Sequence, residues 1–213
     1  MLVYLYITSI AIAFIASLPV HRWGVFSYRV ISTIMGLDLV VELWANFLWF
    51  AFRMNNLPIY NFAMLAEFWL YAFYFDEILV NRTVRPLIKA YLWLLPAVWL
   101  ILVILHQHDW SSIFFVIGAI FTIFLAAFNY YQLFTADELV RLGASFEFWV
   151  ATGLILFYGL NFPYLGMLNF LNKHYPDLAR AMITGLQVLN IIFYSIFTYA
   201  FVCLRRYHIR KSS

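Results

Sequence analysis

Residues 30–52 read VISTIMGLDLVVELWANFLWFAF, an apolar run that contains Asp38, Glu42 and Asn46. A run of about 20 apolar residues is long enough to cross a bilayer as a helix. The three polar residues are spaced four apart, so a helix places them in one stripe on a single face. Ionisable side chains inside a bilayer are costly and usually serve a function. The stretch therefore predicts a membrane-spanning helix whose polar face is turned into a helix bundle.

The composition of the whole chain indicates a membrane protein. Apolar residues make up 66% of the 213 residues and charged residues only 11%, less than half the share that is typical of a soluble domain. A soluble protein could not bury that much apolar surface, so we expect a multi-pass protein of the cell membrane, surrounded by the lipid bilayer. The net charge of +3 is spread over the loops and the C-terminal residues. It is interpreted as a topology signal, and nucleic-acid binding is not expected.

Charged or Pro/Asn-rich breaks divide the chain into seven apolar segments: residues 2–18, 30–52, 61–80, 87–105, 112–134, 145–168 and 178–204. Each segment is close to the length of one transmembrane helix. We therefore predict an all-α fold, a bundle of seven transmembrane helices that forms a single domain over residues 1–204. Residues 205–213 are predicted to be a short basic tail on the cytoplasmic side.

The positions of Lys and Arg orient this predicted bundle. If the seven segments alternate in direction, ten basic residues fall on one side of the membrane and three, Arg53, Lys173 and Arg180, fall on the other. Cytoplasmic loops carry an excess of Lys and Arg. The N-terminus is therefore predicted to lie outside and the C-terminus in the cytoplasm.

Polar residues at helical spacing predict which segments surround the centre of the bundle. The second, third, fifth, sixth and seventh segments each have a polar or small-residue face, and these faces should point inward because lipid cannot satisfy polar groups. The fifth segment shows this as the stripe Gly118, Thr122, Ala126 and Asn129. The first and fourth segments have few polar residues and are expected at the periphery.

The candidate site residues fall into two sets by depth. The outer set forms a polar cup open to the exterior, and its predicted ligand contacts are Asn46, Glu67, Asn161, Gln187 and Asn190. The deeper set is predicted to couple the cup to the inner side or to relay protons, and it contains Asp38, Glu42, Asn129 and Glu147. A structural alternative stays open, because Arg53 could form an ion pair with Glu67 and buried polar contacts often only hold helices together.

Several kinds of chemistry lack their usual residues. The five histidines all fall in predicted loops or near the C-terminus, so no intramembrane metal site or other cofactor is expected, and catalysis is not the favoured function. The topology is similar to that of rhodopsins and the large receptor superfamily. Residues 178–204, however, contain no lysine to bind retinal, and the stretch from Asn190 to Tyr194 lacks the proline of the receptor Asn-Pro-x-x-Tyr motif. The similarity therefore extends to topology alone, and no retinal is expected.

Three functions fit these observations. The favoured one is a sensory or signalling protein that binds a small molecule, cationic or rich in hydrogen-bonding groups, in the outer cup. The loops are too short to hold an output domain, so it would act through a membrane or cytoplasmic protein partner. The second is a proton- or cation-coupled transporter or channel, favoured by acids at successive depths. The third is a structural subunit of a membrane complex.

Overall fold

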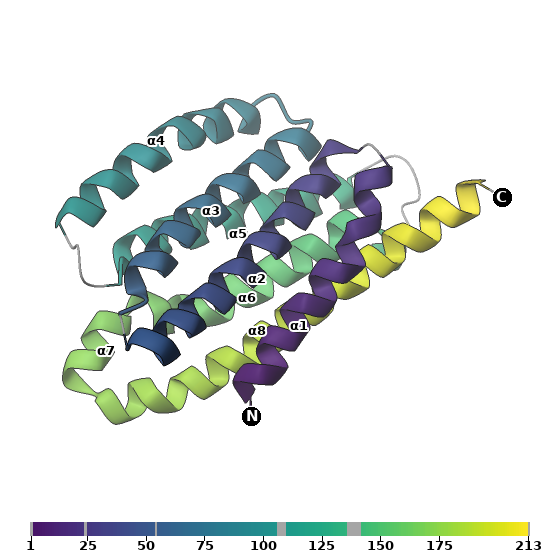
Figure 1. Ribbon diagram of the computed structural model, residues 1–213. Coiled ribbons are helices and arrows are strands. Elements are labelled where there is room, and N and C mark those ends of the chain that lie inside the picture. The colour runs from purple at the N-terminus through teal and green to yellow at the C-terminus, as the bar shows by residue number, and fades with distance from the viewer. Residues whose placement is uncertain (1, 24, 54, 106–109, 136–141, 213) are drawn as a thin grey trace.

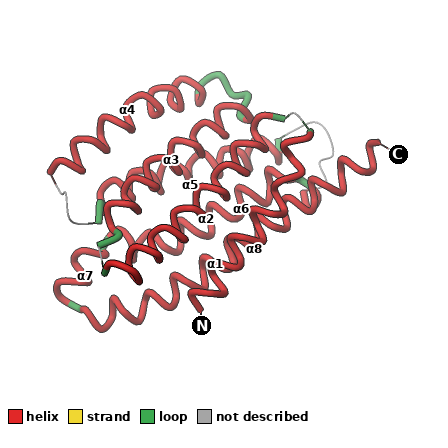
Figure 2. The backbone as a smooth tube through the Cα atoms, in the orientation of Figure 1, coloured by secondary structure: helices red, strands yellow, loops and turns green. Residues whose placement is uncertain are grey.

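The computed structural model describes residues 2–23, 25–53, 55–105, 110–135 and 142–212. The protein is 92% helical, and the described residues contain no strand, which confirms the all-α prediction (Figures 1 and 2). The α-helices are α1 (Leu2–Ser17), α2 (Phe26–Phe52), α3 (Leu57–Ile78), α4 (Val84–Leu105), α5 (Ser112–Phe134), α6 (Phe146–Gly166), α7 (Leu168–His174) and α8 (Pro176–Ser212). Two short 3-10 helices, Leu18–Arg22 and Leu142–Ala144, follow α1 and precede α6.

Six segments of the described chain are helical, long enough and apolar enough to cross a membrane: Leu2–Arg22, Phe26–Phe52, Val84–Ile104, Ser112–Phe134, Phe146–Gly166 and Pro176–Ile209. They are compatible with a multi-pass integral membrane protein. The predicted third span, α3, has 22 residues but is not among the six, because Asn, Glu and several Tyr residues lower its hydropathy. The count of seven spans and the orientation of the termini therefore stay predictions.

The long helices lie side by side with alternating directions, so their connections gather at two ends (Figure 1). One end, here called the basic end, holds the α1–α2 and α3–α4 connections and the C-terminal part of α8. Its described basic residues include Arg22, Arg29, Arg82, Arg85, Lys89, Arg205 and Arg206. The other end, here called the α7 end, holds α7 and the α2–α3 connection. At the basic end α8 continues as a helix to Ser212, so the predicted tail begins inside the helix.

The arrangement of the helices agrees with the prediction that the first and fourth segments lie at the periphery. Helix α4 is the outermost helix and packs mainly on α3 (Figure 1). Helix α1, expected at the periphery as well, packs against both α2 and α8. Its Ser17 is fully buried, and the Ser17 and Ser32 hydroxyls are 2.7 Å apart. The buried residues of α1 are Ile10, Ala13 and Ser17, whereas Tyr4 and Ile15 are 71% and 63% exposed. Helix α1 therefore lies at the edge of the bundle, where its small residues allow close contact with its two neighbours.

The small-residue stripe of α5 faces the interior, as its spacing predicted. Gly118, Thr122, Ala126 and Asn129 are all buried. Gly118 lets the ring of Phe68 from α3 lie directly against the α5 backbone, and a glycine is needed where a side chain approaches a helix this closely. The stripe thus fixes α3 against α5, and α3 supplies much of one wall of the site described next.

Candidate functional site

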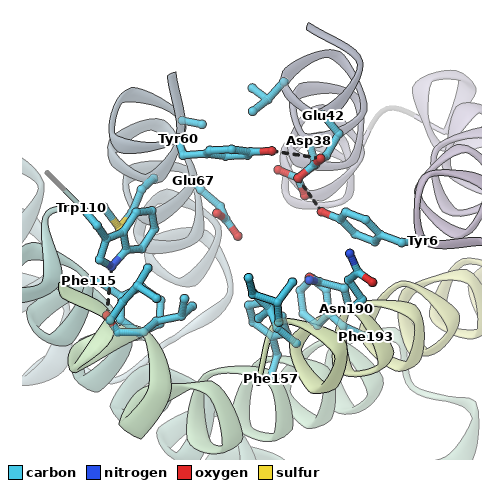
Figure 3. Close-up of a pocket in the computed structure, with 18 of the residues that line it drawn as sticks. Tyr6, Asp38, Glu42, Tyr60, Glu67, Trp110, Phe115, Phe157, Asn190 and Phe193 are labelled. Atoms are coloured by element: carbon cyan, nitrogen blue, oxygen red, sulfur yellow. Dashed lines mark hydrogen bonds between the residues drawn. The ribbon is translucent and has the colours of Figure 1, made fainter. Parts of the chain in front are cut away.

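A cavity of about 490 Å³ lies in the half of the bundle toward the α7 end. Helices α1, α2, α3, α5, α6, α7 and α8 all contribute to its wall (Figure 3). Asn172 and Ile183 line it and are exposed, so the cavity reaches the molecular surface at this end. Its volume is within the range of small-molecule sites, about 300–1,000 Å³.

The Glu42 carboxylate is the most extensively hydrogen-bonded acid of the cavity. Tyr6 of α1 donates its hydroxyl to Oε1 over 2.8 Å, and Tyr60 of α3 donates to Oε2 over 3.2 Å (Figure 3). The Asn46 amide, one helical turn along α2, donates to Oε2 over 3.3 Å and to the Glu42 carbonyl oxygen over 2.8 Å. Three helices therefore meet at this one carboxylate.

Asp38 and Glu67 lie deeper and have one tyrosine each. The Tyr194 hydroxyl of α8 donates to Oδ2 of Asp38 over 3.0 Å, and the Tyr158 hydroxyl of α6 donates to Oε1 of Glu67 over 2.9 Å. Both carboxylates line the cavity and point into it (Figure 3). A carboxylate has about four lone-pair sites, so each keeps hydrogen-bonding capacity for a bound molecule.

The charge of the cavity is one-sided. Its lining includes three carboxyl groups, and none of the described residues that line it is Lys, Arg or His. The remaining lining combines aromatic and aliphatic side chains, and Phe115, Phe157 and Phe193 lie across the cavity from the acids (Figure 3). Aromatic faces attract cations within about 6 Å, and carboxylates do so more strongly. The arrangement is suited to a small organic cation.

No protein-family model, curated protein or solved structure matches this chain. The chemistry of the site therefore rests on its own residues. In the part of the chain that the structure describes, no three His, Cys, Asp or Glu side chains group as metal ligands.

Most of the predicted cup residues meet in this cavity. Asn46, Glu67, Gln187 and Asn190 line it, together with Asp38 and Glu42 from the predicted deeper set. The fifth predicted ligand contact, Asn161 of α6, is 1% exposed and is not part of the lining, so it lies behind the wall. Its Nδ2 makes no hydrogen bond within the described residues.

Glu147 and Asn129 form a separate polar group at the basic end. The Tyr28 hydroxyl donates to Oε1 of Glu147 over 3.0 Å, and Ser145 donates to Oε2 over 2.9 Å. The Asn129 amide donates to the Glu147 carbonyl oxygen over 3.2 Å. Glu147 is the second residue of α6 and therefore lies at the basic end of that helix, whereas the cavity acids lie toward the α7 end.

The ion pair considered between Arg53 and Glu67 is absent from the described residues, in which the one salt bridge joins Arg180 and Asp177. Arg53 ends α2 in a left-handed conformation and its guanidinium lies 5.8 Å from the centre of the Trp49 ring. Glu67 lies ten residues into α3, which is about 15 Å along the helix. The two side chains are therefore held at different depths.

Tyrosines are the functional residues that the sequence analysis did not assign to the site. All four acids described above accept a hydrogen bond from a tyrosine hydroxyl, and Glu42 accepts two. The signal was present in the sequence: the chain contains 15 tyrosines, several of them at helical spacing from an acid or on a facing segment. A membrane helix tolerates a phenol better than an ammonium or guanidinium group. Tyrosine is therefore a hydrogen-bond partner for an intramembrane acid with a lower insertion cost than Lys or Arg.

Proposed function

We propose that this protein binds a small organic cation in the acidic cavity and acts as a sensory or signalling component of the membrane. The observation that supports this most directly is the lining itself, with three carboxyl groups, aromatic walls and no basic side chain among the described lining residues. When ionised, carboxylates at short range in a low-dielectric site repel one another. A bound cation relieves that repulsion, so positive charge is favoured over a neutral molecule of the same shape.

The cavity is closed toward the basic end of the bundle, which supports entry of a ligand from the α7 end only. Toward the basic end the bundle is filled by fully buried aromatic side chains, among them Phe75, Phe197 and Phe201. The Phe193 and Phe197 rings are 4.5 Å apart between centroids, and those of Phe146 and Phe201 are 5.1 Å apart. Such packing prevents solutes from entering the cavity from the basic end, as a binding site for signal detection requires. Output then passes through rearrangement of the helices to a partner protein.

A direct binding measurement tests the proposal. Purified protein in lipid nanodiscs is titrated with phenethylamine, which is protonated at neutral pH, and with 2-phenylethanol, which has the same shape without the charge. We expect the amine to bind at least tenfold more tightly. Equal affinity for the two molecules would refute the cation preference.

Matched variants locate the binding in the cavity. Glu67→Gln should weaken amine binding at least tenfold, because it replaces a cavity carboxylate by a neutral amide of nearly the same size. Glu77→Gln makes the same change at an exposed position near the end of α3 and should leave binding unchanged. If both variants bind like the wild-type protein, the amine occupies another site.

A cation- or proton-coupled transporter is the second candidate, favoured by the succession of Glu42, Asp38 and Glu67 within one cavity. Glu42→Gln separates it from a sensor. A transporter should carry phenethylamine into vesicles and lose that flux in Glu42→Gln, whereas a sensor should show no amine flux with or without the substitution.

A further inference from the structure

Two buried hydroxyls on α3 have no evident structural use. Tyr71 and Tyr74 are both 0% exposed, and neither hydroxyl makes a hydrogen bond within the described residues. Burying an unpaired hydroxyl is costly, whereas a phenylalanine at the same position would carry no such cost. A bundle with many phenylalanines that keeps two such tyrosines on adjacent turns indicates a role for the hydroxyls themselves.

The position of these hydroxyls links two polar groups that are otherwise separate. Tyr71 lies one helical turn beyond Glu67 on α3, and its ring centroid is 6.3 Å from that of Tyr158, the tyrosine that donates to Glu67. Tyr74 lies one turn before Ile78, whose carbonyl oxygen accepts a hydrogen bond from Gln132 of α5. Asn129, three residues before Gln132 on α5, donates to the Glu147 carbonyl oxygen, so Tyr74 and Glu147 lie at a similar level of the bundle. The titratable groups that act electrostatically on this pair are Glu67, Asp38, Glu147 and Tyr28.

The surrounding interior excludes larger species. Phe68 and Phe75 of α3 and Phe197 of α8 are fully buried and offer no polar atoms. At the far end, the Tyr28 and Glu147 side chains are only partly buried and so have contact with the surroundings. A solute or hydrated ion could not pass this layer, but a proton needs only hydroxyl and carboxyl oxygens that can pass it from one to the next.

We propose that Tyr71 and Tyr74 form a proton path from the cavity carboxylates to Glu147. In each step a phenol oxygen accepts a proton from one neighbour and releases its own hydroxyl proton to the next, so the phenol is restored and only O–H bonds break and form. Glu67 supplies the proton at one end. The Glu147 carboxylate accepts it at the other and returns it to water at the basic end. The path does not depend on which molecule the cavity binds.

Proton flux into vesicles tests this path. The full-length protein is reconstituted into liposomes that contain a pH-sensitive dye, and a potassium gradient with valinomycin drives protons across the membrane. Rates are measured in both directions, with and without phenethylamine. We expect the wild-type protein to exceed protein-free liposomes in at least one condition. Tyr71→Phe and Tyr74→Phe should each lower the protein-dependent rate at least tenfold.

A matched control is available in α4. Tyr91 also has a buried hydroxyl without a hydrogen bond in the described residues, but it stacks on Phe121 with ring centroids 3.9 Å apart and lies away from the acids. Tyr91→Phe should conduct like the wild-type protein. Each variant keeps its ring and loses only a hydroxyl, and gel filtration verifies that it folds.

The outcomes separate the path from ligand binding. Tyr74→Phe should keep phenethylamine affinity while losing flux, because Tyr74 does not line the cavity. A wild-type rate equal to that of protein-free liposomes in every condition would overturn the path, as would unchanged flux in both Phe variants or an equal loss in Tyr91→Phe. Absence of amine binding with intact, Tyr74-dependent flux would refute the proposed ligand and leave the path standing.

Discussion

Replacing Gly118 by alanine should destabilise the bundle, because the added methyl group has no space. A Cβ at this position would overlap Cδ2 and Cε2 of Phe68 and lie 2.6 Å from its Cζ, against an ordinary contact of 3.4 Å or more. The Phe68 ring is 1% exposed and is surrounded by Phe114, Phe115 and Tyr158, with ring centroids 5.4 to 6.2 Å away. The ring has no free space to move into, so α5 and α3 must separate.

The free energy of unfolding should fall by about 1–3 kcal/mol, the usual range for an overpacked core. The upper end of this range is expected because the Phe68 ring is held in place by three other rings. Thermal unfolding in detergent, followed by tryptophan fluorescence, measures it. Gly159→Ala is the matched control, since a Cβ there meets nothing within 4 Å and alanine is the better helix former. Phe68→Leu in the Gly118→Ala background should recover part of the loss. If Gly118→Ala and Gly159→Ala unfold at the same temperature, the close contact between α3 and α5 is wrong.

Three further substitutions test the site and its surroundings. Asn161→Leu removes an amide nitrogen that has no hydrogen bond in the described residues. The free energy of unfolding should therefore stay equal or rise, and phenethylamine affinity should stay within threefold. A tenfold loss of affinity in the titration would place Asn161 in the site. Tyr158→Phe leaves Glu67 without its 2.9 Å donor and should lower the free energy of unfolding by about 1–3 kcal/mol, while an unchanged melting curve would contradict that bond. Arg180→Ala breaks an ion pair with Asp177 whose side chains are 74% and 92% exposed, so the same melt should change by less than about 1 kcal/mol.

The helices were predictable because hydropathy and helical spacing are local properties of the sequence. The predicted segment 112–134 coincides with α5, and the inward face of Gly118 to Asn129 follows from the cost of polar groups in lipid. The neighbours of α1 were not predictable in this way. Helices α2 and α8 are brought to it by packing between segments far apart in the chain, and a tyrosine in an apolar segment does not reveal which acid it meets.

The site could be predicted only in part, for a related reason. The acids were identifiable because charge is rare in lipid, and helical spacing assigned Asp38, Glu42 and Asn46 to one face. The partners considered for them were Arg53 and Asn129. Tyrosines on the inward faces were not paired with the acids, because tyrosine is also an ordinary apolar residue and an interfacial one. Asn161 shows the opposite error, since an inward-facing polar residue can lie one layer behind a cavity wall.

The long sequence separations of the tyrosine–carboxylate pairs have a consequence for biosynthesis. Glu67 is joined to a tyrosine 91 residues further along the chain, and Asp38 to one 156 residues further along. While the ribosome is still producing the later helices, both acids are in the nascent chain without these partners. Helix α3, which is not among the six apolar candidate spans, then depends on α2 and α4 to stay inserted. A chain truncated before α6 should be retained by the insertion machinery and degraded by membrane proteases, whereas the complete chain escapes both.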